Sequence, residues 1–385
     1  MRRLLCAALF FFGCILCPLL LLGADVTVTP SIGLKGEYND NIDFTNVDAK
    51  DDWIGTIIPG LKLEYATPRF MLKTEGKVEI EQYLEETDNN TEKYNASVDM
   101  GYQYAGGSGI FGKAAFRRDT TLDQEFQETG LAGVRSHRND YMGGLGFAHF
   151  FTQNVSAGLA YQYEKKEYSR DVYVDSETHG VAANVNYIFN DGIDTASLQP
   201  LYGIQESSEI RVYQYGLAVS LAHKIAENYE ATIKAGAMYS TVSDKIGDEN
   251  ASGWGWIAEA GLAKRWETVS LAINLSRQDS LTSTSSFVTV NRLTASAAYK
   301  FTERLSFNLS GSLYFTKSSS VVNEETTDER SYQITPKLRY QFTEHVNLEI
   351  AYSYTNKHDF NLSSDEDYDR NQAWFLVNFE FPNKI

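Results

Sequence analysis

Alternation of apolar and polar residues along most of the chain is the feature that most constrains its fold. From Tyr94 to Tyr104 every second residue is apolar or aromatic, and the residues between them are polar or glycine. The same period recurs at 305–313 and 332–342. Because successive side chains of a β-strand point to opposite faces, each segment predicts a strand with one apolar and one polar face. No helical period competes with this pattern.

The spacing of these segments predicts a closed sheet. About 18 strands fit the chain, from one near 26–38 to one near 371–381, and short connections alternate with longer polar ones. An even strand number lets an antiparallel sheet close without an unpaired edge in lipid. The sequence therefore predicts an all-β protein, a transmembrane antiparallel up-and-down β-barrel over residues 25–385, with both chain ends on the periplasmic side.

A soluble β-sandwich or β-helix is the alternative, and tryptophan placement bears on the choice. Trp254, Trp256 and Trp266 share the apolar phase of one expected strand. The interval from Trp256 to Trp266 spans on the order of 25 Å in a tilted strand, the height of a barrel's apolar band between its aromatic girdles. A sandwich would bury these rings in its core instead. A β-helix would show a repeated coil motif, which is absent.

The N-terminus predicts export. Arg2 and Arg3 precede an apolar run at 4–22, and the small residues Gly23 and Ala24 follow it, which is the pattern of a cleaved signal peptide at 1–24. A signal anchor remains the alternative. All three cysteines of the chain lie inside this segment at positions 6, 14 and 17. An exported chain without thiols, together with the strand pattern, predicts the bacterial outer membrane.

The net charge of the chain limits which classes of partner are expected. The chain has 34 basic and 51 acidic residues, and removal of Arg2 and Arg3 leaves a net charge of −19. Nucleic acid is therefore excluded as an expected partner. No cofactor or metal motif is present, and the six histidines are scattered without a catalytic pattern, so no enzyme is expected. Acidic clusters at 40–52 and 365–369 predict an outer rim near lipopolysaccharide, either binding divalent cations or simply solvated.

The polar faces of the strands predict a hydrated lumen, because unpaired charges in a dry interior are costly. The basic residues expected to line it, with possible contact to an anionic polymer, are Lys73, Lys77, Lys113, Arg117, Arg265, Arg292, Lys337 and Arg339. The last four are expected on neighbouring strands. Two interpretations stay open for each residue: an ion pair that supports the wall, or a contact to a passing anion.

Two further segments have expected roles. The connection at 119–137 contains Gly130 and Gly133 and is the longest; it either folds inward as a constriction or lies on the surface. Otherwise the lumen is expected to be open. The last strand carries Phe375, Phe379 and Phe381 on its apolar phase, similar to the C-terminal signal that the barrel-assembly machinery recognises. These residues are the expected assembly signal.

A resemblance adds a functional hypothesis. Pro30, Ser31, Tyr38, Asp40 and Asn41 reproduce a P-S-x-x-x-x-x-x-Y-x-D-N opening, which resembles β-barrel porins encoded with exopolysaccharide gene clusters. The resemblance implies an outer-membrane channel that exports a secreted polysaccharide, with a periplasmic export partner, similar in size to the alginate exporter. The alternative is a general or substrate-selective diffusion porin for small solutes. A barrel with a structural, adhesive or enzymatic role is the third hypothesis.

Overall fold

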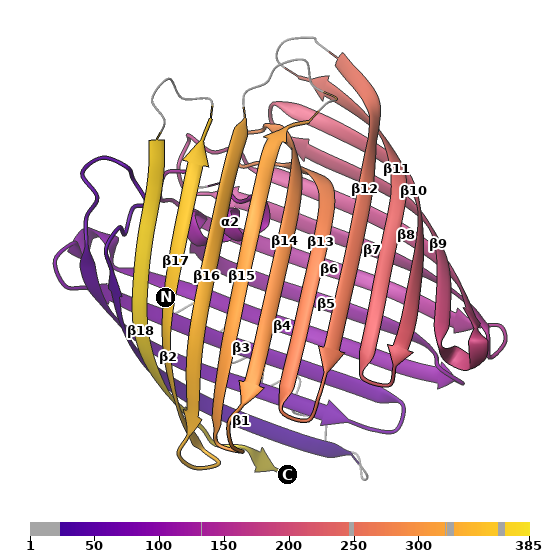
Figure 1. Ribbon diagram of the computed structural model, residues 1–385, viewed down its shortest axis with the longest axis horizontal. Helices are drawn as coiled ribbons and strands as arrows, with labels where there is room; N and C mark the ends of the chain where they lie inside the picture. The colour runs from indigo at the N-terminus through magenta and orange to yellow at the C-terminus, as the bar shows by residue number, and fades with distance from the viewer. Residues whose placement is uncertain (1–23, 132, 246–249, 320, 322–326, 361–365) are drawn as a thin grey trace, which may run out of the picture.

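The computed structural model describes residues 24–131, 133–245, 250–319, 321, 327–360 and 366–385. Eighteen long strands form one antiparallel sheet in chain order, and β1 pairs with both β2 and β18, so the sheet closes into a barrel (Figure 1). The strands are β1 (Asp25–Asn39), β2 (Asp52–Ala66), β3 (Phe70–Tyr83), β4 (Thr91–Ala105), β5 (Ser108–Thr120), β6 (His137–Phe150), β7 (Val155–Tyr168), β8 (Ser176–Phe189), β9 (Asp194–Ser207), β10 (Ile210–Ala226), β11 (Tyr229–Asp244), β12 (Asn250–Arg265), β13 (Val269–Leu281), β14 (Phe287–Lys300), β15 (Leu305–Ser318), β16 (Asp328–Gln341), β17 (Val346–Asp359) and β18 (Glu366–Glu380). The predicted fold class is confirmed.

A few short elements complete the chain. The two-residue strand β19 (Asn383–Lys384) pairs with Thr27 and Val28 at the base of β1. The 3-10 turns η1 (Thr87–Asn89) and η2 (Asn190–Gly192) lie between strands, and the α-helix α2 (Thr121–Thr129) follows β5. Among the described residues no helix is long and apolar enough to cross a membrane. The predicted signal peptide at 1–24 lies outside the described residues except for Ala24, and β1 begins at Asp25.

One end of the barrel is built from tight turns, and three of them share one design. In the turns after Phe151, Phe301 and Phe342, the phenylalanine N–H donates to the carbonyl of the residue four positions later, at 2.9 Å each time. The threonine that follows each phenylalanine accepts hydrogen bonds from backbone N–H groups further along the turn at 3.0 to 3.2 Å. A threonine hydroxyl that mimics a backbone acceptor explains why the sequence repeats Phe-Thr at these sites.

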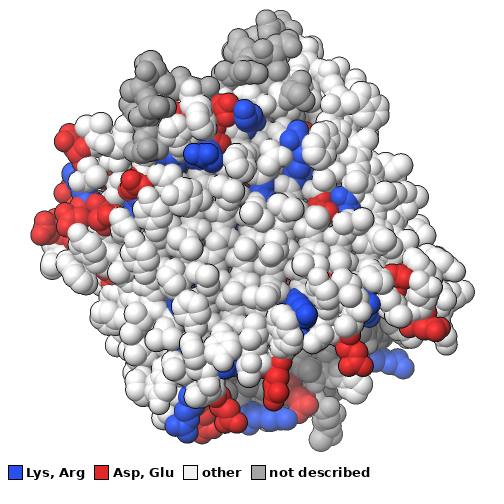
Figure 2. Space-filling view, in the orientation of Figure 1, with Lys and Arg blue, Asp and Glu red and all other residues white. Residues whose placement is uncertain are grey.

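The exterior is apolar, as alternation predicts. Trp254, Trp256 and Trp266 point outward and are 71%, 56% and 45% exposed, respectively. Phe375 and Phe381 are also exposed on the outer surface, and Phe379 is half-buried. Figure 2 shows charged side chains gathered toward the two ends of the barrel, with a largely uncharged wall between them. An uncharged, aromatic-rich wall on a closed barrel suits a bilayer, and the bacterial outer membrane is where this architecture resides.

Candidate functional site

The connection between β5 and β6 folds into the barrel rather than over its surface. Its first half forms α2, and we call residues 121–136 the inward loop. Thr120 is extended and Gly130 has a positive φ of 76°, so the helix begins and ends at these residues. Glycine is required at 130 for a second reason, because a Cβ there would lie 2.4 Å from the Tyr314 Cβ. Of the two alternatives for this connection, the inward constriction is the one that the structure has, so the lumen is narrowed here.

An apolar contact fixes α2 to the wall opposite its own strands. Leu122 and Phe126 are each 1% exposed and pack in a cluster with Phe44, Val288, Val290 and Tyr314. Val288 and Val290 lie on β14, nine strands from β5 in a ring of eighteen. The inward loop therefore reaches the wall on the opposite side of the barrel. Burial of two large apolar side chains provides about 3–6 kcal/mol for this docking.

Hydrogen bonds from the same wall complete the end of the helix. The Tyr314 hydroxyl donates to the Gln127 carbonyl at 2.9 Å, and the Ser331 hydroxyl donates to the Gly130 carbonyl at 2.7 Å. The Thr316 hydroxyl donates to the Thr129 carbonyl. The last carbonyls of a helix have no partner within it, so these side chains of β15 and β16 satisfy groups that would otherwise be buried and unpaired.

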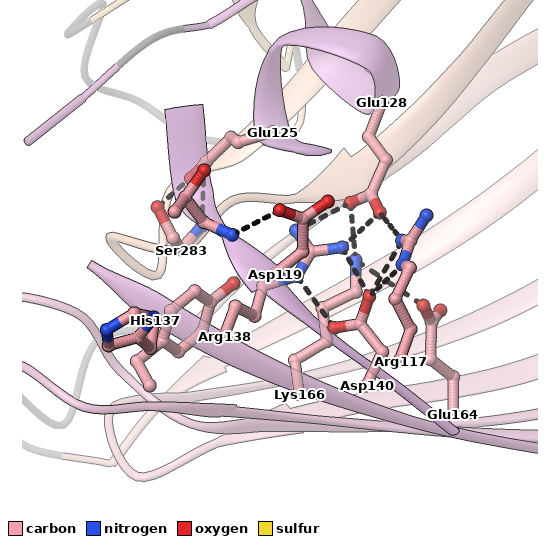
Figure 3. Close-up of polar contacts among 12 residues, drawn as sticks. Arg117, Asp119, Glu125, Glu128, His137, Arg138, Asp140, Glu164, Lys166 and Ser283 are labelled. Carbon is pink, nitrogen blue, oxygen red and sulfur yellow. Dashed lines mark hydrogen bonds and ion pairs between the residues drawn. The ribbon is translucent and has the colours of Figure 1, made fainter. Parts of the chain in front are cut away.

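An ion cluster ties α2 back to the wall from which it emerges (Figure 3). The Glu128 carboxylate binds Arg138 on β6 and lies 2.8 Å from Lys166 on β7 and 3.6 Å from Arg117 on β5. Asp140 adds ion pairs to Arg117 at 2.7 Å and to Arg138 at 2.6 Å. Burial opposes ionisation of Glu128, but the charges of Lys166 and Arg138 outweigh it and lower its pKa to about 2.

Neighbouring loops brace the face of α2 on which Glu125 lies. Glu125 accepts hydrogen bonds from the backbone N–H of Ser283 at 3.1 Å and from the Ser283 hydroxyl at 2.6 Å. Burial raises the pKa of Glu125, and the two bonds from Ser283 oppose this rise. The Tyr173 hydroxyl donates to the Val134 carbonyl at 2.6 Å. Connections β7–β8 and β13–β14 thus hold the inward loop in place from one side.

The opposite face of α2 borders a cavity of about 320 Å³, which we call the constriction cavity. Its walls come from β1–β5 and β16–β18, and Asp123 and Gln127 reach it from the helix. Four cations line it, Lys35, Lys93, Arg135 and Arg370, together with four carboxylates, Glu37, Glu81, Asp119 and Asp123. Burial opposes ionisation of Asp123, but the charges of Arg370, Lys93 and Arg135 prevail and lower its pKa to about 2.

Each of the four cations has a carboxylate partner. Lys93 lies 3.0 Å from Glu81 and 3.1 Å from Asp119, and Arg370 lies 3.1 Å from Asp123. Arg135 lies 3.4 Å from Asp43, and Lys35 binds Glu37. The lining of the constriction cavity is therefore highly charged but nearly balanced, without a strong net sign.

A second cavity, also of about 320 Å³, adjoins the first. It lies along β13–β16 and shares Gln127, Gln333 and Thr335 with the constriction cavity. Serine and threonine side chains dominate its lining, and Arg292 is its one cation. The shared residues separate two polar cavities beside α2, lined by hydroxyl, amide and charged groups.

The predicted lumen residues all lie on the inward phase, but few reach the constriction. Lys73 pairs with Glu64 at 3.2 Å, Lys77 with Glu79 at 2.9 Å and Lys337 with Glu349 at 2.9 Å. Arg117 belongs to the ion cluster. Lys113 lies opposite Asp99 of β4 in the strand register. Many of these charges are thus paired within the wall.

The four cations expected on neighbouring strands are separated. Arg265 is on β12 at its end, Arg292 is on β14, and Lys337 and Arg339 are on β16, so an intervening strand divides each group from the next. Of the four, only Arg292 lines one of the two cavities at α2, where its guanidinium lies 5.2 Å from the Tyr314 ring centroid. The expectation that these four residues lie on neighbouring strands is wrong, because alternate strands supply them.

Sequence reasoning missed most of the residues at the constriction. Lys35 and Glu37 on β1 and Trp374 on β18 stand on the polar phase of their strands, so parity would have placed them in the lumen. A tryptophan among the polar residues of a strand is itself an indication of a side chain in the lumen. The contact between Glu128 and Arg138 carried no such signal, because it depends on how the inward loop docks.

Comparison with known proteins supports the fold. No described protein family and no curated protein matches the sequence. The structure of OccK9 (OpdG) from Pseudomonas aeruginosa aligns over 93% of this chain and 98% of that chain, with 9% identity and a TM-score of 0.51. A BenF-like porin from Pseudomonas fluorescens Pf-5 aligns over 94% and 99%, with 10% identity and a TM-score of 0.51. The chain shares the barrel fold of these porins. The similarity does not extend to the expected association with exopolysaccharide clusters.

Proposed function

We propose that the protein is a substrate-selective diffusion channel, through which small polar solutes cross the outer membrane. The observation that carries this proposal is α2, which is anchored to opposite walls and leaves a constriction cavity of about 320 Å³ beside it. A volume near 300 Å³ is at the lower end of the range for small-molecule sites. Solutes of the size of a sugar or an amino acid fit such a passage.

The anchoring of α2 argues against the expected export of a polysaccharide. A polymer occupies the channel continuously, so export would require the helix to stay displaced for the whole passage. Displacement would expose Leu122 and Phe126 and separate Glu128 from Arg138 and Lys166. The porin fold of the structural relatives favours the same choice. The proposed transport is therefore diffusion of small molecules and not polymer export.

Liposome swelling tests this proposal directly. Purified protein is reconstituted into vesicles, and swelling rates are compared for arabinose, glucose, maltose and maltotriose. We expect rates to fall steeply between the monosaccharides and the trisaccharide, because the constriction admits one ring more easily than three. A protein-free vesicle sets the background. Equal rates for glucose and for a long dextran fragment would contradict the proposal and restore the export hypothesis.

A further inference from the structure

Trp374 is placed differently from every other tryptophan of the chain. The protein has five, and Trp53, Trp254, Trp256 and Trp266 lie exposed on the outer surface, where a membrane interface explains them. Trp374 lies on the inward phase of β18, next to the outward Phe375, and lines the constriction cavity. A bilayer interface cannot account for an indole inside the pore.

Polar groups surround this indole. The Lys35 ammonium lies over one face of the ring, 5.4 Å from its centroid, which leaves the other face for a stacked ligand. The indole Nε1–H donates at 3.4 Å to Glu349, which also pairs with Lys337 at 2.9 Å. Gln372, two residues along β18, donates to Glu37 at 3.0 Å. Gln333 lines the same cavity but is level with Arg370, four residues along β18 from Trp374. Beside the indole, the cavity-lining polar groups are therefore Glu37, which accepts hydrogen bonds, and Gln372, which donates and accepts them.

The charge balance of the cavity defines the class of ligand. Each of its four cations is paired with a carboxylate, so none presents an uncompensated charge to an anion. A carboxylate solute would have to compete with Glu37, Glu81 or Asp123 for these partners. A neutral solute rich in hydroxyl groups can bond to the same groups without separating the ion pairs.

We propose that Trp374 is the stacking platform of a binding subsite for a neutral pyranose sugar. One face of a pyranose carries C–H groups, which are attracted to the negative face of an aromatic ring. Its hydroxyl groups lie around the edge, where Glu37 accepts and Gln372 donates. An aromatic acid would stack on the indole but would leave these edge groups without partners. This inference rests on the proposed function and names its substrate class.

Current blockade in planar bilayers tests the subsite. Single channels are recorded in salt while D-glucose is added, and the concentration that halves the open time is measured. For Trp374→Ala we expect this concentration to rise about tenfold, which corresponds to about 1.4 kcal/mol of lost binding. Trp374→Tyr retains a flat ring and should recover most of the affinity. Trp254→Ala, which removes an outer-surface indole, is the matched control and should block as the unmodified protein does.

The outcomes separate the subsite from the channel. Equal blockade of the Trp374→Ala variant and the unmodified protein would overturn the subsite, as would blockade by benzoate or glycine with none by glucose. A protein that conducts but is not affected by glucose also overturns it and leaves the diffusion channel standing. A folded, heat-modifiable protein that forms no conducting channel overturns both proposals.

Discussion

Glu128→Gln is the substitution that most directly tests how α2 is held in the pore. The change removes the charge that binds Arg138 and Lys166 while it preserves the size of the side chain. Arg138 is 1% exposed, so the substitution removes a partner from a buried guanidinium. The Glu128 side chain itself is 31% exposed. We expect the barrel strands to be unaffected and the docking of α2 to weaken.

The free-energy cost of Glu128→Gln to the docking of α2 follows from these contacts. Removal of one partner from a fully buried ion pair costs about 3–5 kcal/mol. Solvent screening at Glu128 and the remaining Asp140 partner of Arg138 reduce this to about 1–3 kcal/mol. A change of that size raises the population of undocked helix by about 5- to 150-fold. Leu122 and Phe126 still pack on the far wall, so docked helix remains the major state.

Single-channel recording measures this population. The Glu128→Gln channel should show brief openings to a higher conductance much more often than the unmodified channel, at the same voltage and salt. Glu164→Gln is the matched control, because Glu164 lies 3.7 Å from Lys166 on the barrel wall and its loss changes the net charge equally. Identical gating of Glu128→Gln and the unmodified protein, both verified as folded, would refute the idea that the ion cluster anchors α2.

Two further predictions concern the barrel wall and the response to acid. Leu262→Arg places a charge on the lipid face, where Leu262 is 40% exposed, and should cost about 2–4 kcal/mol of stability or block assembly. Ser310→Arg, on the lumen side, should be tolerated. Urea titration of the heat-modifiable form compares the two variants, and equal losses of stability would mean that the strand phases are wrong. The pKa values of Glu128 and Asp123 are lowered to about 2, so their contribution to docking is complete above their unfolded pKa values and is lost as pH falls toward 2. High-conductance openings should therefore stay rare from pH 7 to about pH 5 and increase between about pH 4 and pH 2; a transition near pH 6 would assign the gating to another group.

The sequence by itself determined the barrel. Alternation is a local property, because the face on which a side chain lies depends only on its position in the strand. It placed Trp254 and Trp266 on the outer surface and the lysines of β3 in the lumen, as the structure has them. The repeated Phe-Thr turns are local in the same sense, since the hydrogen bonds made by each phenylalanine N–H and each threonine hydroxyl join residues two to four positions apart.

Only the tertiary structure decided how the lumen is narrowed. From sequence alone, the inward loop could equally have been a surface loop. Its inward position depends on contacts between Phe126 and Tyr314 and between Gly130 and Ser331, and the residues of each pair are far apart in the chain. The neighbours of Trp374 come from β1 and β17, and only closure of the barrel between β1 and β18 brings Lys35 to it. Residue pattern fixes which face a side chain occupies, and long-range packing fixes which side chains meet.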